Sequence, residues 1–195
     1  MNHVHFGYLI MQFIVAMEKE TGAIGLNGDM PWQSKKIKED LAFFKSKTLG
    51  KHIVMGNKTI QGLIKNNIVL KDRHLISLTK NPENQEKNNG IQYCNLSDLI
   101  QLLHQLENHN HDNANEIIIC GGKELYDLMM NNLELRKYLT LGYVSLIEFK
   151  QDKYEYDTDI KSFYHQVINE AQDMSEEVIM DNDDYKLTIQ TFYFT

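Results

Sequence analysis

Residues 24–59 read IGLNGDMPWQSKKIKEDLAFFKSKTLGKHIVMGNKT, and this stretch carries most of the signals that decide the fold. It opens with a glycine-rich loop that ends in a Pro-Trp pair. An apolar repeat at helical spacing then predicts a helix over residues 34–48, which Gly50 ends. Residues 52–55 are an apolar run that predicts a short strand, and Gly56 permits a tight turn into a second helix. Helices and strands that alternate in this way are typical of an α/β protein.

One carboxylate of the first helix is predicted to face inward. At about 100° per residue, Asp40 shares a face with apolar residues, whereas the adjacent Glu39 points to solvent. The apolar residues of that face are Ile37, Leu41 and Phe44. A carboxylate in apolar surroundings costs free energy unless it has partners, and burial raises its pKa. Asp40 is therefore either a functional group or a buried residue that a threonine or a backbone N–H satisfies.

A second glycine turn follows a later strand. Residues 116–120 are almost continuously apolar, which predicts a buried strand, and Gly121-Gly122 then opens a helix. Backbone approaches a phosphate closely only where side chains are absent, and the N–H groups of a helix N-terminus favour an anion. The turns at Gly56 and at Gly121-Gly122 are therefore candidate phosphate sites, although neither is a G-x-G-x-x-G fingerprint.

The ends of the chain complete the predicted sheet. Residues 11–17 predict a buried first strand, and residues 138–149 a long strand. The alternating tail over residues 187–194 predicts a hairpin with residues 175–180, and Ser97 reads as the N-cap of a further helix. We expect one α/β domain with a mostly parallel sheet, an antiparallel C-terminal edge and helices on both faces.

Composition excludes several classes of protein. At 195 residues and 22.8 kDa the chain is the size of one ordinary domain, and its net charge of −7 argues against nucleic acid as the main partner. Cys94 and Cys120 form no disulfide framework, so we expect a reducing, cytoplasmic setting. The first apolar run is too short to span a bilayer, and the histidine spacing matches no strong metal signature.

An ordered set of short motifs resembles the dihydrofolate reductase family along nearly the whole chain. The matching residues are Ile14-Val15-Ala16, Ile24-Gly25, Asp29-Met30-Pro31-Trp32, Asp40-Leu41-Ala42-Phe43-Phe44-Lys45, Val54-Met55-Gly56, Lys58-Thr59, Arg73, Gly121-Gly122, Tyr126, Tyr138-Leu139-Thr140 and Asp157-Thr158. The resemblance implies an eight-stranded sheet in a domain of residues 11–195, with residues 1–10 as an N-terminal extension. It also implies a monomer that transfers a hydride from NADPH to 7,8-dihydrofolate, which gives tetrahydrofolate.

The resemblance assigns a catalytic role to four residues. Asp40 would hydrogen-bond a ring nitrogen and the 2-amino group of the pterin, and Thr140 would hydrogen-bond Asp40 from a distant strand. Trp32 would hold a structural water near the pterin. Met30 would lie on the loop that closes over the nicotinamide, and the pair Asp157-Thr158 would brace that loop.

The resemblance also implies two sets of binding residues. Arg73 would bind the α-carboxylate of the folate glutamate, because its planar fork suits bidentate contact. The substrate set is Ile14, Val15, Asp40, Leu41, Phe44, Leu63, Leu70, Arg73 and Cys120. The cofactor set is Ala16, Ile24, Gly56, Asn57, Lys58, Thr59, Leu78, Thr79, Lys80, Gly121, Gly122, Lys123, Glu124, Leu125 and Tyr126, and the glycine pair is expected to have a cis peptide.

Three features depart from the family pattern. Eight positions separate Trp32 from Asp40, which is more than the family usually has, and residues 33–36 form a basic insertion. Asn57 stands where many members carry a basic residue for the 2′-phosphate, so Lys58 or Lys80 would replace it. Glu124 stands where some members carry a basic residue.

Three other functions fit parts of the pattern. They are a reductase of another heterocycle, such as the pyrimidine reductase of riboflavin synthesis, a non-catalytic binding protein of the same fold, and a plain nucleotide-binding module. Pro31-Trp32, Asp40 and Arg73 together favour folate over another heterocycle. A plain nucleotide-binding module would leave those residues without a use.

Overall fold

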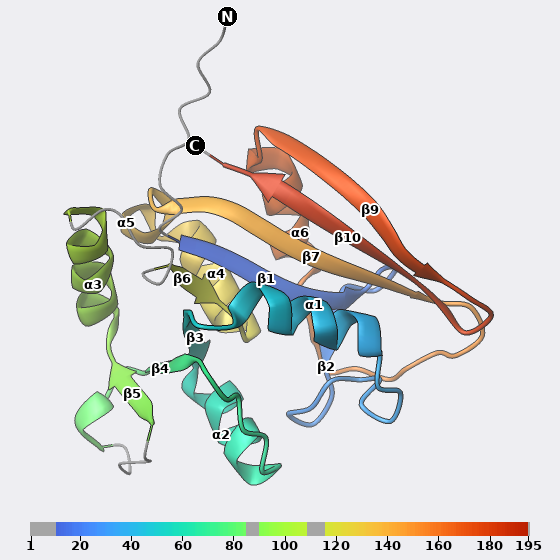
Figure 1. The fold of residues 1–195 in the computed structure, drawn as a ribbon, viewed down its shortest axis with the longest axis horizontal. Helices are drawn as coiled ribbons and strands as arrows, with labels where there is room; N and C mark the ends of the chain where they lie inside the picture. The colour runs from blue at the N-terminus through green and yellow to red at the C-terminus, as the bar shows by residue number, and fades with distance from the viewer. Residues whose placement is uncertain (1–10, 85–89, 109–115, 195) are drawn as a thin grey trace, which may run out of the picture.

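The computed structural model describes residues 11–84, 90–108 and 116–194, and its centre is one eight-stranded sheet (Figure 1). Its strands are β1 (Met11–Glu18), β3 (His52–Gly56), β4 (His74–Leu78), β5 (Ile91–Cys94), β6 (Ile117–Ile119), β7 (Leu139–Phe149), β9 (Asp173–Asp181) and β10 (Tyr185–Tyr193). Their order in the sheet is β5-β4-β3-β6-β1-β7-β10-β9. The short strands β2 (Ala23–Gly25) and β8 (Thr158–Asp159) pair in a separate two-stranded sheet.

The direction of the strands confirms the predicted fold class. Strand β10 is antiparallel to both of its neighbours, β7 and β9, and the other pairs of the large sheet are parallel. Parallel strands place their carboxyl ends at one edge of a sheet, where ligands of α/β proteins bind. The predicted phosphate turns follow β3 and β6, which are neighbours, so both turns lie at this edge.

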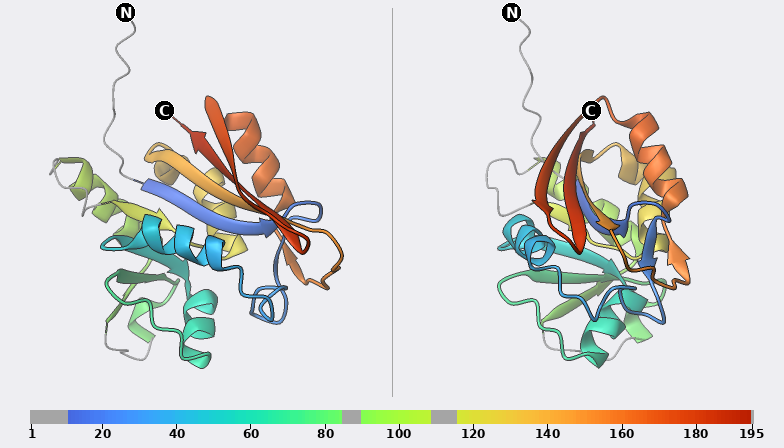
Figure 2. Two further views of the ribbon diagram at one scale, coloured as in Figure 1. Left: turned by 45° about the vertical axis from the view of Figure 1, so that its right-hand side comes forward. Right: turned by 90° about the vertical axis from the view of Figure 1, so that its right-hand side faces the viewer.

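Helices cover both faces of the sheet (Figure 2). The α-helices are α1 (Lys38–Thr48), α2 (Asn57–Lys65), α3 (Leu96–Asn108), α4 (Lys123–Asn131), α5 (Leu133–Arg136) and α6 (Lys161–Glu170). The apolar residues of β1 alternate, so that Phe13 and Val15 pack with α4 and α6 while Ile14 faces the side of α1 and α2. Within the described ranges, no helix is long and apolar enough to cross a membrane.

Two predicted helix starts are wrong. Helix α1 begins at Lys38 and not at residue 34, because the preceding segment forms a turn in which the Lys35 N–H donates to the Trp32 carbonyl at 2.8 Å. Helix α3 begins at Leu96, so Ser97 lies inside it. Asn95 is its cap, because the side chain of Asn95 accepts from the Asp98 N–H at 3.0 Å. The predicted extension over residues 1–10 lies outside the described residues.

A close approach of side chain to backbone fixes the pairing of β1 with β7. Phe13 is opposite Gly142 in the register of these strands. A Cβ atom added to Gly142 would lie 2.1 Å from a ring carbon of Phe13, so the ring occupies the space that any side chain at Gly142 would need. The ring also packs edge-on against Phe163 of α6 at 5.2 Å between centroids. This packing ties α6 to the centre of the sheet.

We expect Gly142→Ala to destabilise the fold by about 1–3 kcal/mol, because the added methyl group overlaps the Phe13 ring. Urea unfolding measures this change. Gly62→Ala in α2 is the control, since its added Cβ would meet its nearest neighbour at an ordinary 3.4 Å. In a double-mutant cycle, Phe13→Leu should relieve part of the cost of Gly142→Ala, and strictly additive losses would contradict the proposed overlap.

Candidate active site

Asp40 is a buried carboxyl in the first turn of α1. Its exposed fraction is 8%, and desolvation raises its pKa above the ordinary carboxyl value. The Ser145 hydroxyl of β7 lies beside it and lowers the pKa, but by less than burial raises it. The predicted inward orientation of Asp40 is confirmed. A carboxyl of this kind retains a proton at a higher pH than an exposed one.

The predicted hydrogen bond from Thr140 to Asp40 is wrong. The Thr140 hydroxyl donates to the Met11 carbonyl at 3.2 Å, at the start of β1. Ser145 is instead paired with Ala16, near the carboxyl end of β1 where the site lies. At about 3.3 Å per residue, the five steps from Thr140 to Ser145 span about 16 Å of β7. Thr140 therefore lies about that far along the strand from Ser145, the residue beside Asp40.

The sequence contains the expected pattern twice, and the second copy is the one that lies beside Asp40. Tyr138-Leu139-Thr140 and Tyr143-Val144-Ser145 both read as tyrosine, aliphatic residue and hydroxyl residue. Only the register of β7 against β1 distinguishes them, and it places Ser145 beside Asp40. The Ser145 hydroxyl is buried. It makes no hydrogen bond of regular geometry to any described residue, and this includes its contact with Asp40. Asp40 is thus only partly compensated for its burial.

Trp32 lies in an apolar cluster beside the start of α1. Its exposed fraction is 2%, and it packs with Ile37, which directly precedes the helix. Ala16 and Phe43 border the same cluster, so Trp32 adjoins both β1 and α1. The insertion at residues 33–36 therefore loops out and returns, and the longer spacing does not separate Trp32 from the site. The predicted structural water remains a prediction.

The apolar residues predicted for substrate mostly share one cluster. That cluster joins Ile14, Phe44, Leu63, Leu70 and Cys120 on the α1 and α2 side of the sheet. The side chain of Val15 packs on the opposite face, so a substrate contact from Val15 would come from its backbone. Burial raises the pKa of the Cys120 thiol, which keeps it protonated at neutral pH.

Leu41 does not pack inward as predicted. Its exposed fraction is 46%, whereas the packed side of α1 carries Asp40 and Phe44. The predicted face includes Ile37 as a helical residue, but Ile37 is the extended N-cap with ψ of 97°. The true packed face is therefore rotated away from Leu41.

Arg73 is fixed beside the end of α1. Its Nε donates to the Thr48 hydroxyl at 2.8 Å, and one terminal nitrogen donates to the Lys71 carbonyl at 2.8 Å. Its guanidinium lies 5.9 Å from the centre of the Phe44 ring. These contacts orient a cation next to the apolar cluster that contains Phe44. Arg73 therefore presents a cation in a fixed position at the rim of that cluster.

The two glycine turns meet at the carboxyl edge of the sheet. The Gly56 N–H donates to the Gly121 carbonyl at 2.7 Å, and Gly121 and Gly122 are joined by the expected cis peptide. Helix α2 begins after Gly56 and α4 after Gly122, and neither N-terminus has a side-chain cap among the described residues. A Cβ on Gly122 would lie 3.2 Å from the Thr59 hydroxyl. Uncapped N–H groups beside backbone without side chains fit a dinucleotide phosphate.

Charged side chains flank these turns. Lys58 and Glu124 form an ion pair with 3.2 Å between nitrogen and oxygen, and both are highly exposed. Glu124 therefore has a cationic partner. Asn57 is the first residue of α2, and its side-chain oxygen accepts from the Ser77 hydroxyl of β4 at 3.3 Å. Lys123 donates to the Asp159 carbonyl at 2.7 Å, which leaves Lys58 as the more accessible cation at this edge.

The remaining residues that were predicted to bind the cofactor are either packed in the core or exposed at the surface. The Tyr126 hydroxyl donates to the Ile14 carbonyl at 2.7 Å, and burial raises the Tyr126 pKa. This bond ties α4 to β1, whose Ile14 side chain belongs to the apolar cluster with Phe44. The side chains of Ile24, Leu78 and Leu125 pack in the main core cluster. Thr79 bonds to β5 through its backbone, and Lys80 is exposed beyond it.

The loop that carries Met30 is held from two sides. The Asn27 N–H donates to an Asp157 carboxylate oxygen at 2.7 Å, and the Asp157 N–H donates to the Gly25 carbonyl at 2.9 Å. This confirms that Asp157 braces the loop. On the other side, the Asn66 amide donates to Asp29 at 2.9 Å. Met30 itself is 41% exposed.

Fold and site together are typical of an α/β protein that binds a dinucleotide beside an apolar substrate site. A family model described as dihydrofolate reductase matches residues 10–192. The chain therefore belongs to the dihydrofolate reductase family.

Named relatives agree with this assignment. The dihydrofolate reductase of Staphylococcus haemolyticus is 30% identical over 135 residues, which cover 69% of this chain and 71% of the relative. The mouse dihydrofolate reductase is 29% identical and covers 82% of this chain and 88% of its own. The solved dihydrofolate reductase of Enterococcus faecalis, complexed with NADP(H) and RAB-propyl, has a TM-score of 0.67 at 24% identity, with 94% and 95% of the two chains covered. The last likeness supports the fold alone.

Replacement of Ser145 should change the titration of Asp40. We expect Ser145→Ala to raise the Asp40 pKa further, because the hydroxyl that favours the ionised form is lost. Carboxyl NMR as a function of pH measures this change. Thr140→Val is the matched control and should leave the Asp40 pKa unchanged. A shift in the control, without one in Ser145→Ala, would refute the assignment of Ser145.

Burial of Asp40 should also cost stability at neutral pH. Its folded-state pKa is raised, so the folded chain binds the proton more tightly, and stability falls as pH rises above the ordinary carboxyl pKa. We expect Asp40→Asn to unfold at higher urea than the wild type at pH 7, with a gap that narrows toward acid pH. Glu39→Gln is the control, because a hydrogen bond from Tyr185 lowers the Glu39 pKa and predicts a change of opposite sign. A less stable Asp40→Asn protein would contradict the argument.

Proposed function

We propose that this chain reduces 7,8-dihydrofolate to 5,6,7,8-tetrahydrofolate with NADPH as hydride donor. Membership of the dihydrofolate reductase family supports this activity over the other heterocycle reductases and over a non-catalytic protein. The observation that carries the proposal is the buried Asp40 carboxyl, which lies in the helix next to the apolar cluster of Ile14 and Phe44. A protein that bound only a nucleotide would have no use for that costly group.

Asp40 is the pterin anchor in this proposal. Its carboxyl hydrogen-bonds a ring nitrogen and the 2-amino group, which fixes the orientation of the ring against Ile14 and Phe44. The raised pKa keeps a proton available nearer to neutral pH and biases the ring toward the protonated form. No side chain delivers the proton to N5 directly, and a water performs that transfer.

The chain positions the two reactants and excludes water. NADPH, when bound, supplies the hydride. The N-termini of α2 and α4, with Lys58 and Thr59 beside them, hold its phosphates. Met30 covers the reacting rings from the loop, Trp32 holds a structural water near the pterin, and Arg73 holds the α-carboxylate of the substrate. Rate enhancement then comes largely from proximity and desolvation.

We also propose that the protein acts as a monomer in the cytoplasm, without nucleic acid. The net charge of −7 supports the absence of a nucleic-acid role. Cys94 and Cys120 are both free thiols, which is consistent with a reducing compartment. Sedimentation of the purified chain tests the monomer.

The direct test is NADPH oxidation, followed by absorbance with and without dihydrofolate. We expect rapid loss of NADPH that requires dihydrofolate, and Asp40→Asn should lower turnover at neutral pH by about a hundredfold or more. NADPH affinity should be unchanged in Asp40→Asn, since the carboxyl is not part of the phosphate turns. Glu39→Gln is the control for charge on the same helix turn. Unimpaired turnover in Asp40→Asn would remove the mechanism, and NADPH binding without dihydrofolate-dependent oxidation would point to another heterocycle.

A further inference from the structure

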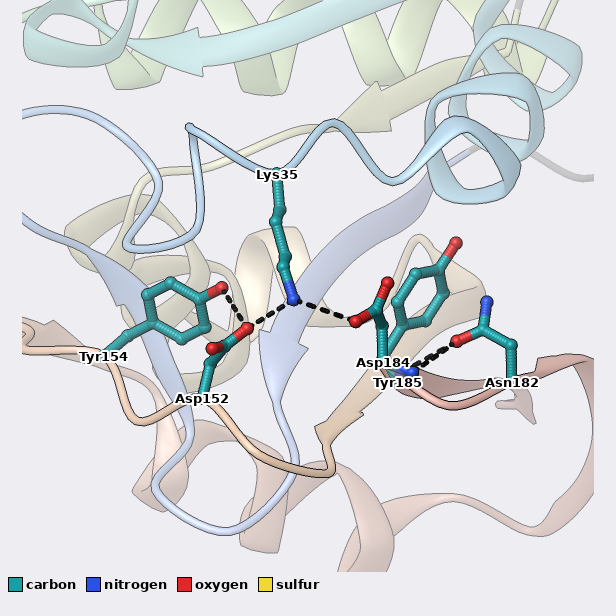
Figure 3. Close-up of polar contacts among 6 residues, drawn as sticks. All are labelled: Lys35, Asp152, Tyr154, Asn182, Asp184 and Tyr185. Carbon is teal, nitrogen blue, oxygen red and sulfur yellow. Dashed lines mark hydrogen bonds and ion pairs between the residues drawn. The ribbon is translucent and has the colours of Figure 1, made fainter.

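The insertion at residues 33–36 is clamped to two distant segments through Lys35. Its ammonium group bonds Asp152, in the loop between β7 and β8, and lies 3.5 Å from a carboxylate oxygen of Asp184, in the turn between β9 and β10 (Figure 3). The Lys35 N–H closes the turn on the Trp32 carbonyl at 2.8 Å. Lys35 thus connects Trp32 to two elements that are more than a hundred residues away in sequence.

Asp152 is also linked to Trp32 by a second route, through two aromatic residues. The Tyr154 hydroxyl donates to the same Asp152 carboxylate at 3.2 Å (Figure 3). The Tyr154 ring packs on Phe149 with 4.6 Å between centroids, and Phe149 packs on Trp32 at 5.8 Å. Backbone, ion pair and aromatic contacts therefore hold the Trp32 turn from both sides.

The contact with Asp184 leads to the helix turn that contains Asp40. The Asn182 side chain accepts from the N–H groups of Asp184 and Tyr185, which shapes the hairpin turn (Figure 3). The Tyr185 hydroxyl then donates to the Glu39 carboxylate at 2.6 Å. Burial and this bond raise the pKa of Tyr185 to about 12, so the hydroxyl stays protonated as a donor. Glu39 adjoins Asp40. Residues of one hairpin turn therefore bind both Lys35, before α1, and Glu39, in the first turn of α1.

We propose that Lys35 is a positioning residue, which locks the insertion onto the β7–β8 loop and the β9–β10 turn and thereby holds Trp32 and the first turn of α1 in their catalytic places. The inference rests on the proposed reductase function. It assigns a use to the insertion, which lengthens the connection between Trp32 and Asp40 and would otherwise loosen both.

Solvent exposure indicates that the clamp serves geometry more than stability. The side chains of Lys35, Asp152 and Asp184 are 35%, 41% and 69% exposed, and ion pairs of this exposure contribute little to the free energy of folding. The contacts of Lys35 with Asp152 and Asp184 and the packing of Phe149 on Trp32 nevertheless all act on one turn and restrict its position. A small displacement near reacting groups lowers a rate far more than it lowers stability.

The single tryptophan of the chain provides a readout that does not depend on activity. Trp32 is that residue and is 2% exposed, so acrylamide should quench its fluorescence weakly in the wild type. We expect Lys35→Met to raise the quenching constant about threefold and to lower kcat about tenfold, with KM for NADPH unchanged. Lys36→Met removes the same charge from the same insertion at an exposed position and should match the wild type in both measurements. Lys35→Arg should restore most of the loss, because it keeps a cation within reach of both carboxylates.

Each outcome supports or overturns the clamp. Equal quenching and equal kcat in Lys35→Met and Lys36→Met would overturn it, as would raised quenching with kcat unchanged. If circular dichroism finds Lys35→Met unfolded, Asp152→Asn carries the same test, because it removes the partner without altering the insertion. Loss of kcat in Asp152→Asn should not add to that in Lys35→Met, and additive losses would contradict a shared role. Absence of dihydrofolate-dependent oxidation in the wild type defeats the proposed function instead, while Trp32 quenching still tests the clamp.

Discussion

The pairing of β1 with β7 is the constraint on which the site depends. Its register sets Phe13 against Gly142 on one face and brings Ser145 level with Ala16 near Asp40. A shift of one residue would turn every side chain of β7 to the other face of the sheet. The Phe13 ring opposes such a shift, because only a glycine fits opposite it. A contact between the core and the backbone therefore decides which hydroxyl accompanies the buried carboxyl.

The fold and the two glycine turns at the carboxyl edge of the sheet were predictable because their signals are local. Continuous apolar runs predicted β1 and β6, and glycines after β3 and β6 predicted two turns that the sheet order makes neighbours. The inward orientation of Asp40 also followed from helical spacing. The exposure of Leu41 did not, because the prediction placed the extended residue Ile37 on the helix. An error of a few residues in a helix start is enough to rotate its predicted face.

The parts that the sequence did not disclose depend on pairing across the chain. Thr140 and Ser145 belong to equivalent short patterns, and the choice between them requires a register that no local signal contains. The insertion shows the same limit. In the sequence its lysines indicate only a basic insertion, whereas in the structure Lys35 bonds residues at separations of 117 and 149 positions. Long-range ion pairs leave no periodicity in the sequence, so only the structure distinguishes Lys35 from Lys36.

Burial, core packing and polar contacts together explain how the fold holds the Asp40 carboxyl in a fixed position. Within the part of the chain that the structure describes, the partner of the Asp40 carboxyl is the incompletely bonded Ser145 hydroxyl, so burial of Asp40 opposes folding at neutral pH. The large apolar clusters supply the stability that tolerates this cost. The first turn of α1 also needs an orientation relative to the sheet. That orientation comes from polar contacts at the edge of α1, where Glu39 bonds Tyr185 and the preceding turn bonds Asp152. Core packing thus allows the site to exist, and peripheral polar contacts determine its geometry.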